Sequence, residues 1–135
     1  MSSARSLAAQ CRLSFEAQPA LRAALLFGSV AREQATPSSD VDIAVVGEGV
    51  DVLGLSTDLS LLLRREVDVV AVSPEVSLPL LRSILRDGRV LYERAPGQAA
   101  SFLAQARAVN ELDTPNYERM MSRFMSRVAR RGVGP

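Results

Sequence analysis

Residues 25–46 read LLFGSVAREQATPSSDVDIAVV, two apolar runs separated by a polar segment. The first run ends at Gly28–Ser29, and the second opens with Asp-Val-Asp at residues 40–42. Successive side chains of a β-strand point to opposite faces, so a strand over residues 40–46 places both carboxylates on one face and the branched apolar side chains on the other. The stretch therefore predicts a strand, a tight turn into a short helix, a polar loop and a second strand.

Asp40 and Asp42 form a candidate metal site. Two neighbouring carboxylates repel each other, which disfavours ionising both unless a cation compensates them. Oxygen ligands of this kind suit Mg²⁺, which usually takes one or two carboxylates together with substrate phosphates. A calcium loop of the EF-hand type is disfavoured, because its third ligand, its glycine at the sixth position and its glutamate at the twelfth are missing.

The Gly28–Ser29 turn adds a candidate phosphate site, although a plain tight turn is the alternative interpretation. Glycine lets the backbone bend and lets a ligand approach closely. The free N–H groups at the start of a helix opening at Ser29 can hold an anion. Together with the carboxylate pair, the turn indicates an enzyme that uses a nucleotide.

The order of these motifs resembles the signature of the minimal nucleotidyltransferases (MNT domains) of the DNA polymerase beta superfamily. That signature reads GS, then AR, then SDxD, and it is matched here by Gly28–Ser29, Ala31–Arg32 and Ser39–Asp42. The resemblance covers roughly residues 21–94. One position departs from it: the family usually has glycine after the arginine, where this chain has Glu33, and a carboxylate there would oppose an anionic ligand.

The resemblance implies an α/β (α+β) fold, with a small mixed β-sheet of the nucleotidyltransferase type flanked by helices. It also implies two-metal nucleotidyl transfer, with two Mg²⁺ ions as cofactors and ATP as substrate. Asp40 and Asp42 would bind both ions. Asp68, on a later β-branched run, would ligate the metal at the attacking hydroxyl, and Glu66 is the rival third ligand.

The nucleotide would be held by the turn before the loop. The resemblance implies that Gly28 and Ser29 bind its outer phosphates. Arg32 either points back at the phosphates, where a guanidinium binds in a bidentate manner, or is a surface residue of the short helix.

A stand-alone domain of this size is similar to the antitoxin of HEPN/MNT toxin–antitoxin pairs. That similarity implies transfer of AMP from ATP to a tyrosine hydroxyl of a partner toxin, a HEPN-domain RNase. An alternative is a catalytically weak or inactive module that neutralises its partner by contact, an interpretation that Glu33 favours. A second alternative is a small-molecule nucleotidyltransferase. Such an enzyme needs a pocket for its acceptor, and the chain looks short for one unless a dimer or a partner supplies a wall.

Composition narrows the chemistry further. The chain has 135 residues, of which 47% are hydrophobic and 23% charged, so one domain is expected. Its net charge is +1, so direct nucleic-acid binding is not expected. There is no lysine and no histidine, and Cys11 is the single cysteine, which excludes a P-loop, an internal disulfide, a Cys/His zinc site and a Ser-His-Asp triad. No apolar run has transmembrane length, and a cytoplasmic location is expected.

Patterning along the rest of the chain predicts further elements. Helices are expected at residues 3–18, 53–65 and 73–87, and strands at residues 22–27, 67–72 and 90–92. Residues 1–95 are expected to form the nucleotidyltransferase domain, and residues 96–135 a C-terminal helical extension packed on it. The extension would either pack as a terminal helix or bind the HEPN-family partner, and a homo-oligomer is left open.

Overall fold

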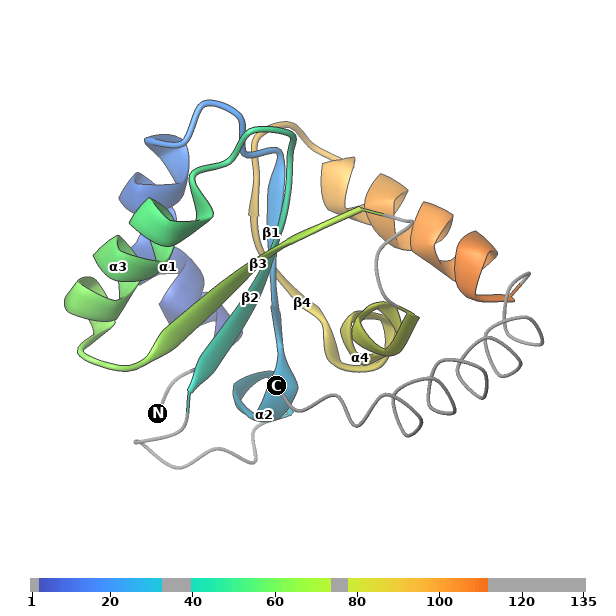
Figure 1. Ribbon diagram of the computed structural model, residues 1–135, viewed down its shortest axis with the longest axis horizontal. Coiled ribbons are helices and arrows are strands. Elements are labelled where there is room, and N and C mark those ends of the chain that lie inside the picture. The colour runs from blue at the N-terminus through green and yellow to red at the C-terminus, as the bar shows by residue number, and fades with distance from the viewer. Residues whose placement is uncertain (1–2, 33–39, 74–77, 112–135) are drawn as a thin grey trace, which may run out of the picture.

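In a computed structural model, a four-stranded sheet forms the centre of the protein (Figure 1). The structure describes residues 3–32, 40–73 and 78–111. The elements in chain order are α1 (Ala4–Glu16), β1 (Ala23–Phe27), α2 (Gly28–Ala31), β2 (Val41–Val46), α3 (Val52–Leu63), β3 (Val67–Val72), α4 (Leu78–Asp87) and β4 (Arg89–Glu93). A further helix follows at residues 98–111. Within these described ranges, no helix has both the length and the apolar character needed to cross a membrane.

The sheet is mixed, with the order β3-β2-β1-β4. Strand β1 pairs in antiparallel fashion with both β2 and β4, whereas β2 and β3 are parallel. The register places Asp42 of β2 beside Phe27 of β1 and beside Asp68 of β3. The expected α/β fold with a small mixed sheet and flanking helices is therefore confirmed.

Helices cover both faces of the sheet (Figure 1). Helices α1 and α3 pack on one face, and α4 and the helix at residues 98–111 pack on the other. Each face has its own buried cluster, because alternate strand residues point to opposite sides. The first cluster takes Val41, Ile43 and Val45 from β2. The second takes Ala44 and Val46, so Asp42 points towards this second face.

Local backbone interactions explain where helices α1 and α3 begin and where α3 ends. Ser3 caps α1 by accepting from the N–H of Ser6 at 3.1 Å, and Asp51 caps α3 by accepting from the N–H of Gly54 at 3.0 Å. Such caps satisfy N–H groups that have no partner within the helix. Helix α3 ends two residues earlier than its pattern predicts, because Arg64 adopts a left-handed conformation with φ of 54°.

Several expectations fall on residues that the structure does not describe. They are the interpretation of Glu33, the loop at residues 35–39, the first turn of the helix predicted from Ser73, and the tail beyond residue 111. The division into residues 1–95 and 96–135 remains a prediction.

Candidate active site

The candidate site lies where β1 ends and β2 and β3 begin. Gly28 follows β1 directly and has φ of +76°, a conformation that side chains other than hydrogen disfavour. A Cβ placed on Gly28 would overlap the Oδ2 atom of Asp42. The missing side chain therefore makes the room in which the Asp42 carboxylate lies against the turn.

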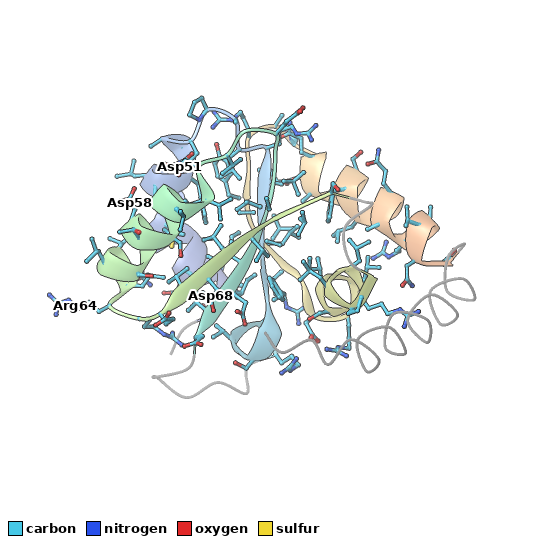
Figure 2. The ribbon with its side chains drawn as sticks, in the orientation of Figure 1. Asp51, Asp58, Arg64 and Asp68 are labelled. Carbon is cyan, nitrogen blue, oxygen red and sulfur yellow. The ribbon has the colours of Figure 1, made fainter. Side chains whose placement is uncertain are left out.

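Asp42 and Asp68 are neighbours across the parallel pair β2–β3, so their side chains leave the sheet on the same face. Asp42 is half-buried and Asp68 is exposed. Figure 2 shows Asp68 towards the end of the sheet that carries α2. Asp40 is exposed and directly precedes β2, so two of the three predicted ligands lie on strands and the third at a strand entrance.

The charges of Asp40 and Asp68 act on Asp42. The pKa of Asp42 is raised above its usual value, first by burial and then by the negative charges of Asp68 and Asp40. Glu66, the rival third ligand, is exposed and precedes β3 by one residue, and its carbonyl accepts from the N–H of Val41 at 2.9 Å. The structure thus brings Asp40, Asp42 and Asp68 into one electrostatic cluster.

The donor set fits a hard cation. Carboxylate oxygens are the ligands that Mg²⁺ prefers, and a divalent cation would relieve the repulsion that raises the pKa of Asp42. Among the described residues, however, no three acidic, cysteine or histidine groups stand close enough together to hold a metal ion as they are. Asp68 and Asp40, which are both exposed, are free of the packing that fixes Asp42 and could turn towards it.

Arg32 takes a partner that the sequence did not indicate. Its Nη1 lies 3.1 Å from Oδ2 of Asp87, at the end of α4, and this places α2 against α4. Arg86 also binds Asp87, donating from Nε and Nη2 at 3.1–3.2 Å. Hydrogen bonds from Arg86 and Arg32 hold the pKa of Asp87 below its usual value. The carboxylate of Asp87 is buried, and two guanidinium groups compensate its charge.

Comparison with known proteins now identifies the family. The sequence profile described as "Polymerase beta, Nucleotidyltransferase" matches residues 10–97, well over half of the chain. The chain belongs to this nucleotidyltransferase family. The match includes every predicted site residue from Gly28 to Asp68 and also Asp87. No curated protein sequence matches the chain significantly.

Solved structures share the nucleotidyltransferase fold. A chain of a toxin–antitoxin complex with AMP-PNP is 20% identical, with a TM-score of 0.72 over 87% of this chain and 98% of that one. A mutant MntA-HpeT toxin–antitoxin complex gives 19% identity and a TM-score of 0.71 over 87% of this chain and 98% of that one. A structure of a tri-AMPylated Shewanella oneidensis HEPN toxin in complex with MNT antitoxin gives 19% identity and a TM-score of 0.67 over 88% of this chain and 96% of that one. At sequence identities of 19–20%, the likeness shows a shared fold and nothing further.

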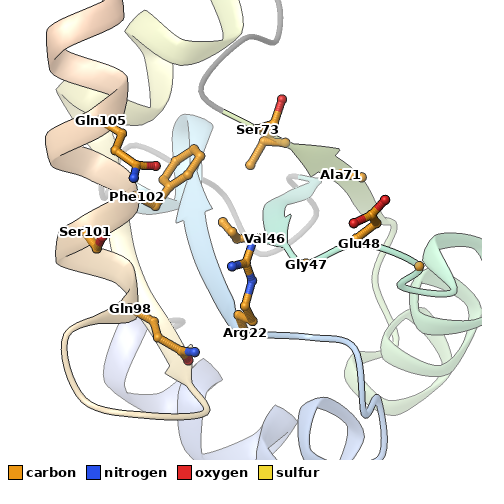
Figure 3. A pocket seen from close by; sticks show the side chains of 12 residues that line it. Arg22, Val46, Gly47, Glu48, Ala71, Ser73, Gln98, Ser101, Phe102 and Gln105 are labelled. Carbon is orange, nitrogen blue, oxygen red and sulfur yellow. The ribbon is translucent and has the colours of Figure 1, made fainter.

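A hollow of about 560 Å³ lies elsewhere on this nucleotidyltransferase (Figure 3). Phe102 and Gln105 line it from the helix at residues 98–111, and Arg22, Val46 and Glu48 line it from the ends of strands and a loop. Val46 ends β2, whereas Asp42 lies near its start, so the hollow is at the opposite end of the sheet from the carboxylates.

Sequence reasoning missed the contact between Asp87 and Arg32. The position of Asp87 before Gly88 marks a helix end, and Gly88 does donate to the Ile84 carbonyl at 2.7 Å. Nothing in the spacing of Asp87 links it to Arg32, which lies 55 residues earlier. Only the packing of α2 against α4 joins them.

Proposed function

We propose that this chain is a metal-dependent nucleotidyltransferase that moves AMP from ATP to a hydroxyl group, namely a tyrosine of a HEPN-type partner toxin, and so acts as an antitoxin in the cytoplasm. Family membership supports the reaction class. The similar structures that contain AMP-PNP or an AMPylated HEPN toxin support the nucleotide and the acceptor. The observation that carries the proposal is the half-buried Asp42 carboxylate, held against Gly28 and in register with Asp68.

The carboxylates are the proposed metal ligands, with Asp40 and Asp42 shared between two Mg²⁺ ions and Asp68 completing the set. Bound there, Mg²⁺ would lower the pKa of the acceptor hydroxyl and neutralise the charge of the leaving pyrophosphate. Asp42 contributes a fixed position, because its side chain is packed against the turn. Asp68 and Asp40 contribute charge at the open side of the site, where an acceptor can approach.

The turn is the proposed phosphate site. Gly28 has no side chain to keep a phosphate away from the backbone, and Phe27, at the N-cap of α2, offers no polar side chain to occupy the first N–H groups. Ser29 adds a hydroxyl that is half-buried at this point.

Arg32 is proposed to bind the nucleotide phosphates. Its ion pair with Asp87 does not oppose this role. If Arg32 turned to a phosphate, Arg86 would still compensate the buried carboxylate of Asp87. An unpaired buried charge, which is costly, would therefore be avoided.

A label-transfer experiment tests the proposal. The purified chain is incubated with Mg²⁺, α-labelled ATP and an extract of its source cell, and labelled products are separated. Asp42→Asn removes one carboxylate charge at constant shape and should abolish transfer. Asp58→Asn, an exposed carboxylate of α3, is the matched control and should transfer normally. Full activity in Asp42→Asn would refute the assignment of the carboxylates. Label on RNA or on a small molecule would show that the acceptor is not a tyrosine of a partner protein.

A second candidate is a module that neutralises its partner by contact alone. The observation in its favour is that the described carboxylates do not converge into a ready metal site. Neutralisation by contact predicts that an Asp40/Asp42 double variant protects cells from the partner as well as the parent chain does. Nucleotidyl transfer predicts that the double variant loses protection while it still binds.

A further inference from the structure

The strand order arranges the parts of the proposed site in a row. Strand β1 leads into the Gly28–Ser29 turn, β2 carries Asp42, and β3, which carries Asp68, forms the edge of the sheet. In phosphoryl transfer the attacking and leaving oxygens lie roughly in line, on opposite sides of the phosphorus. With the leaving pyrophosphate held at the turn, as proposed above, the acceptor hydroxyl approaches from the opposite side, over the outer edge of β3.

The direction of the backbone hydrogen bonds alternates along β3. The N–H of Val41 donates to the carbonyl of Glu66 at 2.9 Å, and the parallel register continues from there in steps of two residues. The even-numbered residues of β3 therefore direct their N–H and C=O groups to β2, and the odd-numbered residues direct theirs away from it. Val67, Val69 and Ala71 thus present backbone groups to the outer edge.

The outer edge is closed at one end and open at the other. Ser56 of α3 donates to the carbonyl of Val67, and the N–H of Val67 donates to Oγ of Ser60 at 3.1 Å. No described residue pairs with the outward groups of Val69 and Ala71. Figure 1 shows β3 passing in front of β2 and β1, with no described helix in front of it. A strand edge of this kind is a template for pairing with another extended chain.

A hollow of about 570 Å³ lies beside the closed end of this edge. Thr57 and Leu61 line it from α3, and Val67 and Asp68 line it from the start of β3. Leu61 is 75% exposed, so the hollow has an apolar wall that an incoming side chain could cover. Asp68 thus belongs both to the carboxylate cluster and to the wall of this hollow.

The open edge indicates what kind of molecule carries the acceptor hydroxyl. An extended polypeptide supplies N–H and C=O groups at the spacing of Val69 and Ala71, and main-chain hydrogen bonds of this type hold peptides on sheet edges in β-augmentation. A nucleic acid or a small metabolite has no such repeat. Alternate side chains of the added strand then point to opposite faces of the sheet.

We infer that the acceptor is a polypeptide segment that binds in extended form along β3, pairs with Val69 and Ala71, and holds its acceptor residue opposite Asp68. This inference rests on the proposed function and adds how the acceptor is recognised. A side chain opposite Asp68 lies on the carboxylate face, about 5 Å away between Cβ atoms, so the long side chain of tyrosine suits this position better than serine. The next residue, opposite Val67, points to the other face and enters the hollow at Leu61, where an apolar side chain fits.

Ala71→Pro tests the pairing. The N–H of Ala71 points to the outer edge, so proline removes a donor for the incoming segment without removing a bond to β2, and an edge strand tolerates this. Transfer from α-labelled ATP to the labelled protein of the source-cell extract should fall at least tenfold, through a higher KM for the acceptor. The affinity for AMP-PNP in the presence of Mg²⁺, measured by calorimetry, should stay unchanged, because the proposed phosphate site follows β1, two strands away.

Leu61→Glu and Leu53→Glu test the hollow as a matched pair. Both leucines are exposed on α3, at 75% and 81%, but Leu53 does not line the hollow. Leu61→Glu should raise the KM for the acceptor about tenfold, and Leu53→Glu should transfer as the parent chain does. Because both changes fall on exposed side chains of α3, this pair also applies if Ala71→Pro does not fold.

Amide hydrogen exchange supplies a readout that does not depend on activity. A synthetic peptide that spans the labelled tyrosine of the acceptor protein is added to the full chain. The peptide should slow the exchange of the Val69 and Ala71 amides. The Val70 amide, which donates to β2, should be protected with and without the peptide.

The outcomes separate this inference from the proposed function. Transfer to a protein that Leu61→Glu or a folded Ala71→Pro leaves unchanged would overturn the inference alone, as would a peptide that leaves exchange at Val69 and Ala71 unaltered. Label on RNA or on a small molecule would also overturn it, while nucleotidyl transfer would stand. A parent chain that labels no acceptor at all would remove the proposed function, and the inference with it.

Discussion

Gly28→Ala tests whether the turn after β1 holds Asp42 in place. Gly28 has φ of +76°, and an added Cβ would overlap Oδ2 of Asp42 while its carbon atoms lie 3.3 and 3.5 Å away. The overlapping atom is the end of a side chain that can rotate, so the substitution should move the carboxylate rather than break the strand. The chain should remain folded and lose its proposed chemistry.

The expected cost has two parts. An alanine in the left-handed region costs ~1–2 kcal/mol relative to glycine. Driving the Asp42 side chain away from its preferred rotamer adds ~0.5–1.5 kcal/mol. The sum of ~1.5–3.5 kcal/mol corresponds to a fall in Tm of roughly 6–14 °C for a domain of this size. Because a displacement of about 1 Å can cost 10²-fold in rate, transfer activity should fall at least that far.

Gly97→Ala is the matched control. Gly97 has φ of +89° and no atom within 4 Å of an added Cβ, so its substitution carries the backbone strain alone, ~1–2 kcal/mol. Thermal melts of both variants, and of Gly28→Ala in an Asp42→Ala background, separate the two parts. In that background Gly28→Ala should cost only as much as Gly97→Ala. If it costs the same in both backgrounds, Asp42 is not packed on Gly28 and the reasoning is wrong.

Three further predictions concern titratable groups. The pKa of Asp87 is lowered from 3.8 by two arginine hydrogen bonds, so its stabilising effect is present above that pH and lost as the pH falls through the folded value; Asp87→Asn should lower Tm at pH 7 but not in strong acid. The pKa of Asp42 is raised from 3.8, so its ionisation favours the unfolded chain; Asp42→Asn should raise Tm at neutral pH in chelator, with a gain that shrinks as the pH falls through the raised folded value and is lost below pH 3.8. Burial raises the pKa of Cys11 to about 11, so a thiol reagent should label it only as fast as the chain unfolds.

Local elements follow closely from the sequence. The apolar stripe Leu7, Cys11 and Phe15 predicts the buried face of α1, and all three residues are buried. The β-branched run at residues 67–72 predicts a strand, and it matches β3 at both ends. Such patterns succeed because side-chain periodicity depends only on local backbone geometry.

Pairings between distant residues do not follow from spacing. Residue periodicity does not show that β2 runs parallel to β3 and antiparallel to β1, because both arrangements bury the same apolar face. The ion pair of Arg32 with Asp87 arises only after α2 and α4 meet. Leu62 is at helical spacing with the buried Leu55 and Leu59 and is nevertheless 51% exposed. Helix α3 is apolar around most of its circumference, so its pattern leaves the buried face poorly defined.

The position of the carboxylates is nevertheless a consequence of the core pattern. Val41 and Ile43 of β2, and Val67 and Val69 of β3, point into the cluster beneath α1 and α3. A slip of one residue in either strand would turn these side chains away from the helices and expose them. The same burial that fixes the register therefore sets Asp68 beside Asp42 on the opposite face. The apolar contacts on one face thus align the proposed metal ligands Asp42 and Asp68 on the other, so enlarging or truncating these apolar side chains should disturb the site without touching it.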